Sequence, residues 1–493
     1  MSYEVDSLEE SYPLLASKSS GFEGSGAISS SHESDSGMQS SGIFETKVYK
    51  KRWYMLTVFC IIAFVQGLLW NTWSPLGDAL LVGFGWTDDF LAFSLAMSGL
   101  GIVTCTFPVI YLIEKKDLRV ATIFAVVLLV GCTVIWNIAY IAQLEVVFVI
   151  GCYFTGVSSC LALAGPPLLS VLWFPVTERT TATAFASMST HFGIGLGFIV
   201  GPFVSGVRIT AEEVDHLDNV TAHRKEEIQD GLQRVVYFDT VLAIICFILV
   251  LLHFPAKPPT PASRAQAKPR TEHWAGLKTV TCNYQFWILN MAFNVANGTF
   301  NAWLPMLSVL FSTGLGLDET VGDWIGFVAT IIGCTGSVLI ALAVDRHKRH
   351  TKRVLQIMSI LAISLYVVLS CVQSGYIKIH GETALTVCLY LLVVGIAICM
   401  NGGVPLFYEL GCEITYPVHE GLSSAYITVF NDFFGLVFYA LFFIPGLGDG
   451  DSWTTWACLV ACVTSFPMLL LLRESYNRLN EESPETEAKE QHA

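Results

Sequence analysis

A few polar and aromatic side chains interrupt the apolar segments of this chain, and they are the groups that could do chemistry. The segment AFVQGLLWNTW (63–73) places Gln66 and Trp70 one helical turn apart, with Asn71 next in sequence. A tryptophan ring can stack on a flat or cationic solute, while a neighbouring amide orients it. The alternative is that these residues serve packing, with Trp73 as an interfacial anchor and Gln66 in an interhelical hydrogen bond. Gly67 could let a neighbouring helix approach or let its own helix flex.

Two titratable side chains lie deep in apolar runs. His191 lies within SMSTHFGIGLGF, and Asp432 follows an asparagine in a long apolar segment. Histidine changes its charge near neutral pH, and intramembrane carboxylates often mark proton or ion pathways. The alternatives are an interhelical hydrogen bond for His191 and a water-solvated carboxylate near the membrane edge for Asp432.

Asparagines recur along one later segment at intervals of four, three and four residues. This spacing puts them on one face of a helix, so we expect them to line a cavity. They are Asn290, Asn294, Asn297 and Asn301.

The elements that position these groups must be membrane helices. Of 493 residues, 53% are hydrophobic and only 14% charged, and the mean hydropathy is +0.57, far from a soluble protein. A formal charge of −14 argues against a nucleic-acid partner. We find no metal-ligand cluster, phosphate loop or nucleophile–base pair, so we expect no enzyme activity, no metal and no cofactor. About twelve apolar segments are long enough to span a bilayer: 53–73, 89–113, 119–142, 146–173, 181–206, 235–254, 284–311, 324–344, 353–373, 383–406, 423–445 and 453–472.

Lysine and arginine gather in alternate connections, which predicts that both termini are cytosolic. A segment rich in proline and basic residues, 255–283, falls between the sixth and seventh spans. We therefore expect an all-α membrane protein with two six-helix bundles related by a pseudo-two-fold axis. The predicted domains are a disordered tail (1–46), the first bundle (47–254), the linker (255–283), the second bundle (284–473) and a cytosolic tail (474–493).

Matched charged turns follow the second span of each half: IEKKDLR (113–119) and AVDRHKR (343–349). They form a weak internal repeat, although the positive-inside rule alone could produce them. Glu409 and Glu413 lie near the cytosolic end of the tenth span, where they could bridge helices. We expect a set of gating residues here: Glu114, Asp345, Arg346, Glu409 and Glu413.

The first tail carries a possible sorting signal. In EESYPLL, Glu10 precedes Leu14 and Leu15 with the spacing of an acidic dileucine signal, which a clathrin adaptor could read. Asn219 begins an Asn-Val-Thr sequon in the loop after the fifth span and is a candidate glycosylation site.

Several long motifs resemble one family of solute carriers. The motifs are AFVQGLLWNTW, WFPVTERTTATAFASM, DWIGF, YELGCEITYPVHEG and RESYNRL. They are similar to solute carrier family 49, the transporters related to the feline leukaemia virus subgroup C receptor, over about 49–479. The resemblance implies a major facilitator fold, and its lysosomal branch implies proton-driven export of pyridoxine to the cytosol. Other branches handle choline, ethanolamine or haem.

The resemblance also implies a binding site. Trp70 falls where choline-handling members place a cation-binding tryptophan, and His191 and Asp432 fall where they have polar cavity residues. Asn301 replaces a tyrosine that would complete a quaternary-ammonium cage, which favours pyridoxine over choline. The expected substrate site is Gln66, Trp70, Asn71, His191, Asn297, Asn301 and Asp432, with His191 or Asp432 carrying the proton. A non-transporting nutrient sensor with the same cavity is the alternative from another class.

Overall fold

Helices make up nearly all of the described chain. The computed structural model describes residues 47–86, 88–207, 209, 213, 220–262, 271–315, 317, 319–346, 350–441 and 452–481. The predicted sorting residues Glu10, Leu14 and Leu15 and the sequon at Asn219 lie outside this part, so both stay predictions.

The described α-helices follow one another along the chain. They are α1 (Lys51–Asn71), α2 (Gly77–Phe84), α3 (Asp88–Lys115), α4 (Leu118–Ala142), α5 (Glu145–Ala164), α6 (Pro166–Trp173), α7 (Arg179–Ser205), α9 (Ala222–Leu252), α11 (His273–Cys282), α12 (Tyr284–Trp303), α13 (Leu307–Leu315), α14 (Glu319–Arg346), α15 (Thr351–Gln373), α16 (Glu382–Thr415), α17 (Glu420–Leu441), α18 (Ser452–Leu471) and α19 (Asn477–Glu481).

Local sequence explains several of the boundaries. The Asp117 side chain accepts a hydrogen bond from the Val120 amide and caps α4, and Asn283 caps α12 through the Phe286 amide, each at 3.1 Å. Pro166 stands at the first position of α6, where its missing amide hydrogen costs nothing. The fourth predicted span is therefore two successive helices, α5 and α6.

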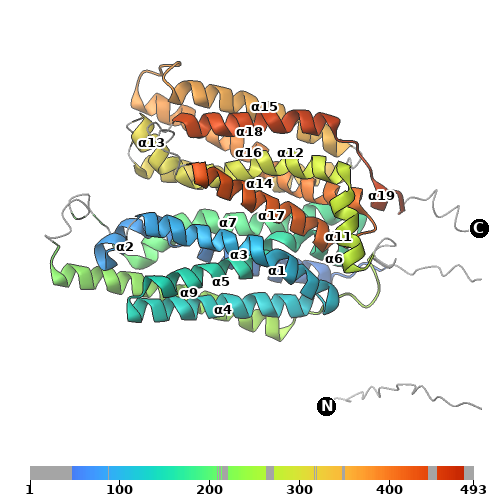
Figure 1. Ribbon diagram of the computed structural model, residues 1–493, viewed down its shortest axis with the longest axis horizontal. Coiled ribbons are helices and arrows are strands. Elements are labelled where there is room, and N and C mark those ends of the chain that lie inside the picture. The colour runs from blue at the N-terminus through green and yellow to red at the C-terminus, as the bar shows by residue number, and fades with distance from the viewer. Residues whose placement is uncertain are drawn as a thin grey trace, which may run out of the picture. The chain divides into compact units, whose positions relative to one another are not determined.

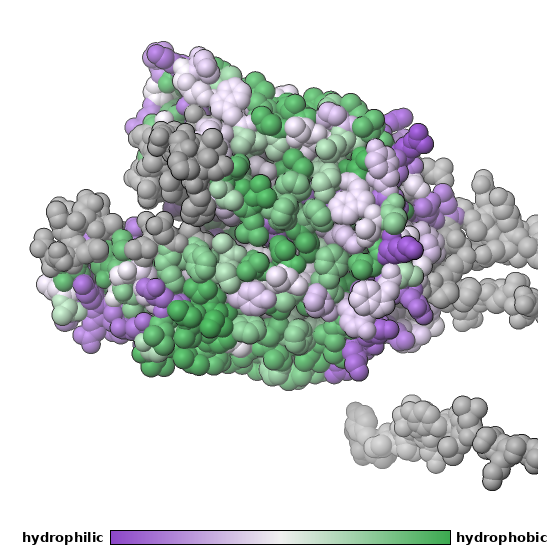
Figure 2. All heavy atoms as spheres, in the orientation of Figure 1, coloured by the Kyte–Doolittle hydropathy of each residue, from purple (hydrophilic) through white to green (hydrophobic). Residues whose placement is uncertain are grey.

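Eleven helical stretches of the described chain are long and apolar enough to cross a membrane. They correspond to eleven of the twelve predicted spans. The exception is the predicted seventh span, where α12 is 20 residues long but carries all four asparagines of the stripe. Figure 2 shows a hydrophobic belt around the middle of the visible face and hydrophilic residues toward its two ends, as a bilayer requires.

The two halves of the chain pack their helices in the same pattern. In the first half α1 contacts α7, α3 contacts α5, and α4 contacts both α5 and α9. In the second half α12 contacts α17, α14 contacts α16, and α15 contacts both α16 and α18. Across the two halves α7 contacts α14, and α3 contacts α17, which are equivalent pairs. The two sets lie one above the other in Figure 1.

Close approach of α1 and α7 depends on glycine. A side chain at Gly67 would overlap the Thr190 carbonyl, and one at Gly193 would overlap the Phe64 carbonyl. Of the two roles that the sequence offered for Gly67, the structure shows the close helix approach. This contact fixes the face of α1 that carries Trp70 against the helix that carries His191.

The predicted linker and the predicted C-terminal tail both contribute ordered structure. Helix α11 forms inside 255–283, and α19 forms inside 474–493, at the same end of the helix bundle (Figure 1). We call this the linker end. Arg478 of α19 is only 2% exposed, so this part of the predicted cytosolic tail packs against the helices.

Candidate functional site

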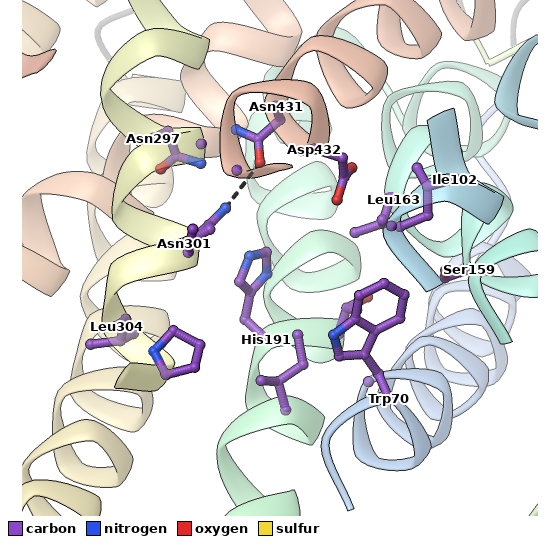
Figure 3. A pocket seen from close by; sticks show the side chains of 18 of the residues that line it. Trp70, Ile102, Ser159, Leu163, His191, Asn297, Asn301, Leu304, Asn431 and Asp432 are labelled. Atoms are coloured by element: carbon purple, nitrogen blue, oxygen red, sulfur yellow. Dashed lines mark hydrogen bonds between the residues drawn. The ribbon is translucent and has the colours of Figure 1, made fainter. Parts of the chain in front are cut away.

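One cavity of about 200 Å³ lies between the two sets of helices (Figure 3). Its walls come from α1, α3, α5 and α7 on one side and from α12, α14, α16 and α17 on the other. All seven residues of the expected substrate site line it: Gln66, Trp70, Asn71, His191, Asn297, Asn301 and Asp432. The structure thus brings them together, while their role in binding stays a prediction.

Trp70 presents its indole to the cavity. It comes from the last turn of α1, and Figure 3 shows its ring below Asp432 and beside His191. Among the described residues, no aromatic ring packs against it closely enough for a ring contact. Trp70 is partly exposed, so its ring can be reached from the cavity.

Gln66 and Asn71 serve the packing of α1 as well as the cavity. The Gln66 amide donates to the Thr155 carbonyl at 3.1 Å and accepts from the Ser158 hydroxyl at 2.6 Å. Asn71 donates to the Ile194 carbonyl at 3.0 Å. These bonds agree with the packing interpretation of both residues, and they hold α1 rigidly behind Trp70.

His191 offers a free acceptor to the cavity. Its Nδ1 lies 3.1 Å from the Ser187 carbonyl oxygen. Because a carbonyl can only accept, Nδ1 must carry the hydrogen in this contact. In the neutral ring Nε2 then keeps its lone pair, and it can accept a hydrogen bond or a proton.

Asp432 extends from α17 toward the centre of the cavity (Figure 3). In the described part of the chain no lysine, arginine or histidine forms an ion pair with its carboxylate. An intramembrane carboxylate is costly unless it meets water, a proton or a cation. Asp432 is therefore suited to bind one of these in the cavity.

The asparagine stripe divides into two functional parts. Asn297 and Asn301 line the cavity as expected. Asn290 and Asn294 do not, because both are fully buried and bond to each other at 2.8 Å. Asn431 of α17 joins the parts by accepting from Asn301 at 3.0 Å and donating to Asn294 at 3.3 Å.

Two of the predicted gating acids bind across the halves at the linker end. Asp345 of α14 accepts from the backbone amide and hydroxyl of Thr181, at 2.7 and 2.6 Å, near the start of α7. A carboxylate there also meets the positive end of the helix dipole. Glu409 of α16 accepts from Thr183 of α7 at 2.6 Å and from Ser170 of α6 at 3.2 Å.

A third gating acid joins the first half to the linker and to the second half. Glu114, at the end of α3, lies 2.6 Å from Nδ1 of His273 in α11 and 3.6 Å from Nδ1 of His419, just before α17. Glu413 instead bonds to Arg478, at 3.0 Å. Arg346 is exposed, and no ion pair engages it in the described chain.

Sequence reasoning left several of these groups out of the expected site. Tyr439 lines the cavity seven residues after Asp432, a helical spacing that could have identified it. Ser158 and His273 gave no such signal, because a serine in an apolar run and a histidine in a polar linker are both common. Arg478 lies within RESYNRL, a motif used for the family resemblance but given no role.

Known proteins similar to this chain fall in one superfamily. The family model "Major Facilitator Superfamily" matches residues 55–440. A Xenopus laevis protein named solute carrier family 49 member 4 homolog is 27% identical, over 88% of this chain and 93% of its own. A Danio rerio choline/ethanolamine transporter is 24% identical, over 80% of this chain and 78% of its own. The crystal structure of the transporter FucP in the outward conformation gives a TM-score of 0.68 at 14% identity, covering 86% of this chain and all of FucP.

Proposed function

The chain belongs to the Major Facilitator Superfamily, within solute carrier family 49, and we propose that this membrane transporter exports pyridoxine from the lysosome with protons. The observation that carries the proposal is the shared cavity of Trp70, His191 and Asp432, between the two halves. Pyridoxine is a small flat heteroaromatic with several hydroxyl groups, so it needs a ring to stack on and acceptors for its hydroxyls.

Each of the three side chains supplies one part of that recognition. The ring of Trp70 stacks on the pyridine ring. Nε2 of His191 accepts a hydrogen bond from a substrate hydroxyl. The Asp432 carboxylate accepts from a second hydroxyl, or pairs with the ring nitrogen when that nitrogen is protonated.

Proton coupling uses either the His191 imidazole or the Asp432 carboxylate. When the cavity faces an acidic lumen, His191 or Asp432 takes up a proton, and that proton leaves on the neutral cytosolic side. The two residues are alternatives, since either is accessible from the cavity and neither has a fixed counter-charge in the described chain.

Alternating access places the gate at the linker end. The contacts of Asp345 with Thr181, Glu409 with Thr183, and Glu114 with His419 join the two halves there, so this conformation is closed at that end. With both termini cytosolic, the linker end faces the cytosol. Export then requires these contacts to break while the cavity closes on the luminal side.

A choline or ethanolamine substrate is the second candidate. Two features favour it: the tryptophan ring, which suits a quaternary ammonium, and the Asp432 carboxylate, which has no ion-pair partner in the described part of the chain. Asn301 argues against it, because its amide is engaged by Asn431 and supplies no second aromatic wall. Haem transport and a sensor that binds without transport are tested in the same assay.

The decisive experiment measures uptake of labelled pyridoxine by cells that display the transporter at the plasma membrane. A Leu14→Ala, Leu15→Ala variant is intended to remain there, so the medium takes the place of the lysosomal lumen. Uptake should rise when the medium is acidified and collapse with a protonophore. Unlabelled choline, ethanolamine and haem serve as competitors.

The outcomes separate the candidates. If unlabelled choline inhibits the uptake of labelled pyridoxine more strongly than unlabelled pyridoxine does, choline replaces pyridoxine as the assigned substrate. Saturable pyridoxine binding without uptake would indicate the sensor. Surface-expressed protein that neither binds nor transports pyridoxine would contradict the proposal.

A further inference from the structure

The chain continues in ordered contact with the helices after its last span. Past α18, the backbone amide of Arg473 donates to the Gln285 side chain at 2.9 Å. The Glu474 carboxylate accepts from the Lys352 amide at 2.8 Å, and the Lys352 ammonium donates to the Leu472 carbonyl at 2.6 Å. These bonds direct residues 473–481, here named the C-terminal strap, toward the end of α16.

The strap places one buried arginine beside three carboxylates. Arg478 lies 2.6 Å from Glu409, 3.0 Å from Glu413 and 4.0 Å from Glu420. The Leu479 amide adds a hydrogen bond to Glu413 at 3.0 Å. Burial by itself would lower the pKa of the guanidinium, but Glu413 and Glu409 outweigh that effect and hold the pKa above its ordinary value.

Glu409 connects this cluster to the opposite half of the molecule. Its Oε2 receives Arg478, while its Oε1 receives the hydroxyls of Thr183 and Ser170. Arg478 and Glu409 both belong to the second half of the chain, and the two hydroxyls belong to the first. Separation of the halves would therefore break the two hydroxyl contacts and leave the ion pair intact.

We propose that Arg478 is a positioning residue of the transport cycle, which holds the Glu409 carboxylate aimed at Thr183 and Ser170 so that the linker-end gate can close. A buried carboxylate needs a partner. Arg478 remains that partner whether the gate is open or closed. The proposal rests on the alternating-access part of the proposed function and not on the identity of the substrate.

The other charged groups of the cluster fit this assignment. Glu413 holds Arg478 from the same helix, and Glu420 approaches from the start of α17. Arg179, at the start of α7, lines the same small pocket as Glu409 and Arg478. Cations from both halves thus face the carboxylates, but the strap supplies the one that bonds directly to Glu409.

Hydrogen exchange in purified full-length protein tests this without a substrate. In Arg478→Gln, amides of 170–183 should exchange about tenfold faster, because the facing half loses its contact with Glu409. Arg473→Gln removes the same charge from an exposed position of the strap and should leave that segment unchanged.

Two further variants separate positioning from general stability. Arg478→Lys keeps the charge and should restore much of the protection of 170–183. Glu409→Gln combined with Arg478→Gln should also restore part of it, since a neutral amide oxygen can still accept from Thr183. Unchanged exchange in 170–183 with Arg478→Gln, or no rescue by either variant, would overturn the proposal. Failure of pyridoxine transport in the wild type would leave this result standing.

Discussion

The carboxylate of Glu114 and Nδ1 of His273 lie 2.6 Å apart, and they join the end of α3 to the linker helix α11. The ring of His273 also packs edge-on against Tyr111, with centroids 4.9 Å apart. Both side chains are about nine-tenths buried, so solvent screens the contact little. The linker between the halves is thus attached to one half by a specific polar contact.

Replacing Glu114 should release α11 and weaken closure at the linker end. A double-mutant cycle of Glu114→Gln and His273→Ala in a thermal-unfolding assay should give a coupling energy of about 1.5–3 kcal/mol, the range for hydrogen bonds to charged groups. Lys278→Ala is a matched control on the same helix. A coupling energy near zero would mean that the contact does not hold the linker.

Trp70→Ala should raise the apparent KM for the transported solute. Loss of one ring contact of ~1–2 kcal/mol weakens binding about five- to thirtyfold. Trp70→Phe should retain part of the affinity, and Trp324→Ala, at a half-exposed tryptophan of α14, should have no effect. The measurement is concentration-dependent uptake at equal surface expression. An unchanged KM in the alanine variant would remove Trp70 from the binding site.

The sequence predicted which side chains line the cavity, but it did not predict their hydrogen-bond partners. Helical spacing put Gln66 and Trp70 on one face, and the structure has both in the cavity wall. Spacing could not show that the Gln66 amide bonds to Thr155 and Ser158, because those contacts depend on how α1 meets α5. The same holds for the asparagine stripe. The burial of Asn290 and Asn294 depends on tertiary packing, which the spacing of residues in the sequence does not show.

Long-range ion pairs were the least predictable part. Glu409 and Glu413 could be identified as buried acids near a span end, yet their partner Arg478 is more than sixty residues away. Its short helix follows the last span and resembles a polar tail in composition. A charge that is buried by tertiary contacts alone leaves no local signal in the sequence.

Neutral substitutions in the cavity should separate the two proton-coupling candidates. His191→Gln and Asp432→Asn keep the shape of each side chain and remove its ability to exchange a proton. The variant at the coupling residue should lose the rise of pyridoxine uptake on acidification, while the other keeps it. The measurement is initial uptake across a series of external pH values. Equal acid stimulation in both single variants and in the double variant would exclude this pair.

Asp239 of α9 poses a separate problem of stability. Its side chain is fully buried, and neither carboxylate oxygen has a hydrogen-bond partner among the residues that the structure describes. Leucine has the same branching, so Asp239→Leu removes two unbonded oxygens without opening a cavity. The variant should be about 1–3 kcal/mol more stable, the usual cost of an unsatisfied buried polar group.

The matched change Asp239→Asn should give a smaller gain, because it leaves one acceptor and adds two donors without partners. Thermal unfolding of both variants measures the difference, and uptake at neutral and acidic external pH accompanies it. A more stable leucine variant with full transport would show that Asp239 lowers the stability of the protein without contributing to transport. A more stable variant that no longer responds to pH would instead show that stability is given up at this position for coupling. A less stable leucine variant would contradict the prediction, since it would mean that the carboxylate bonds to a group or a water within the membrane.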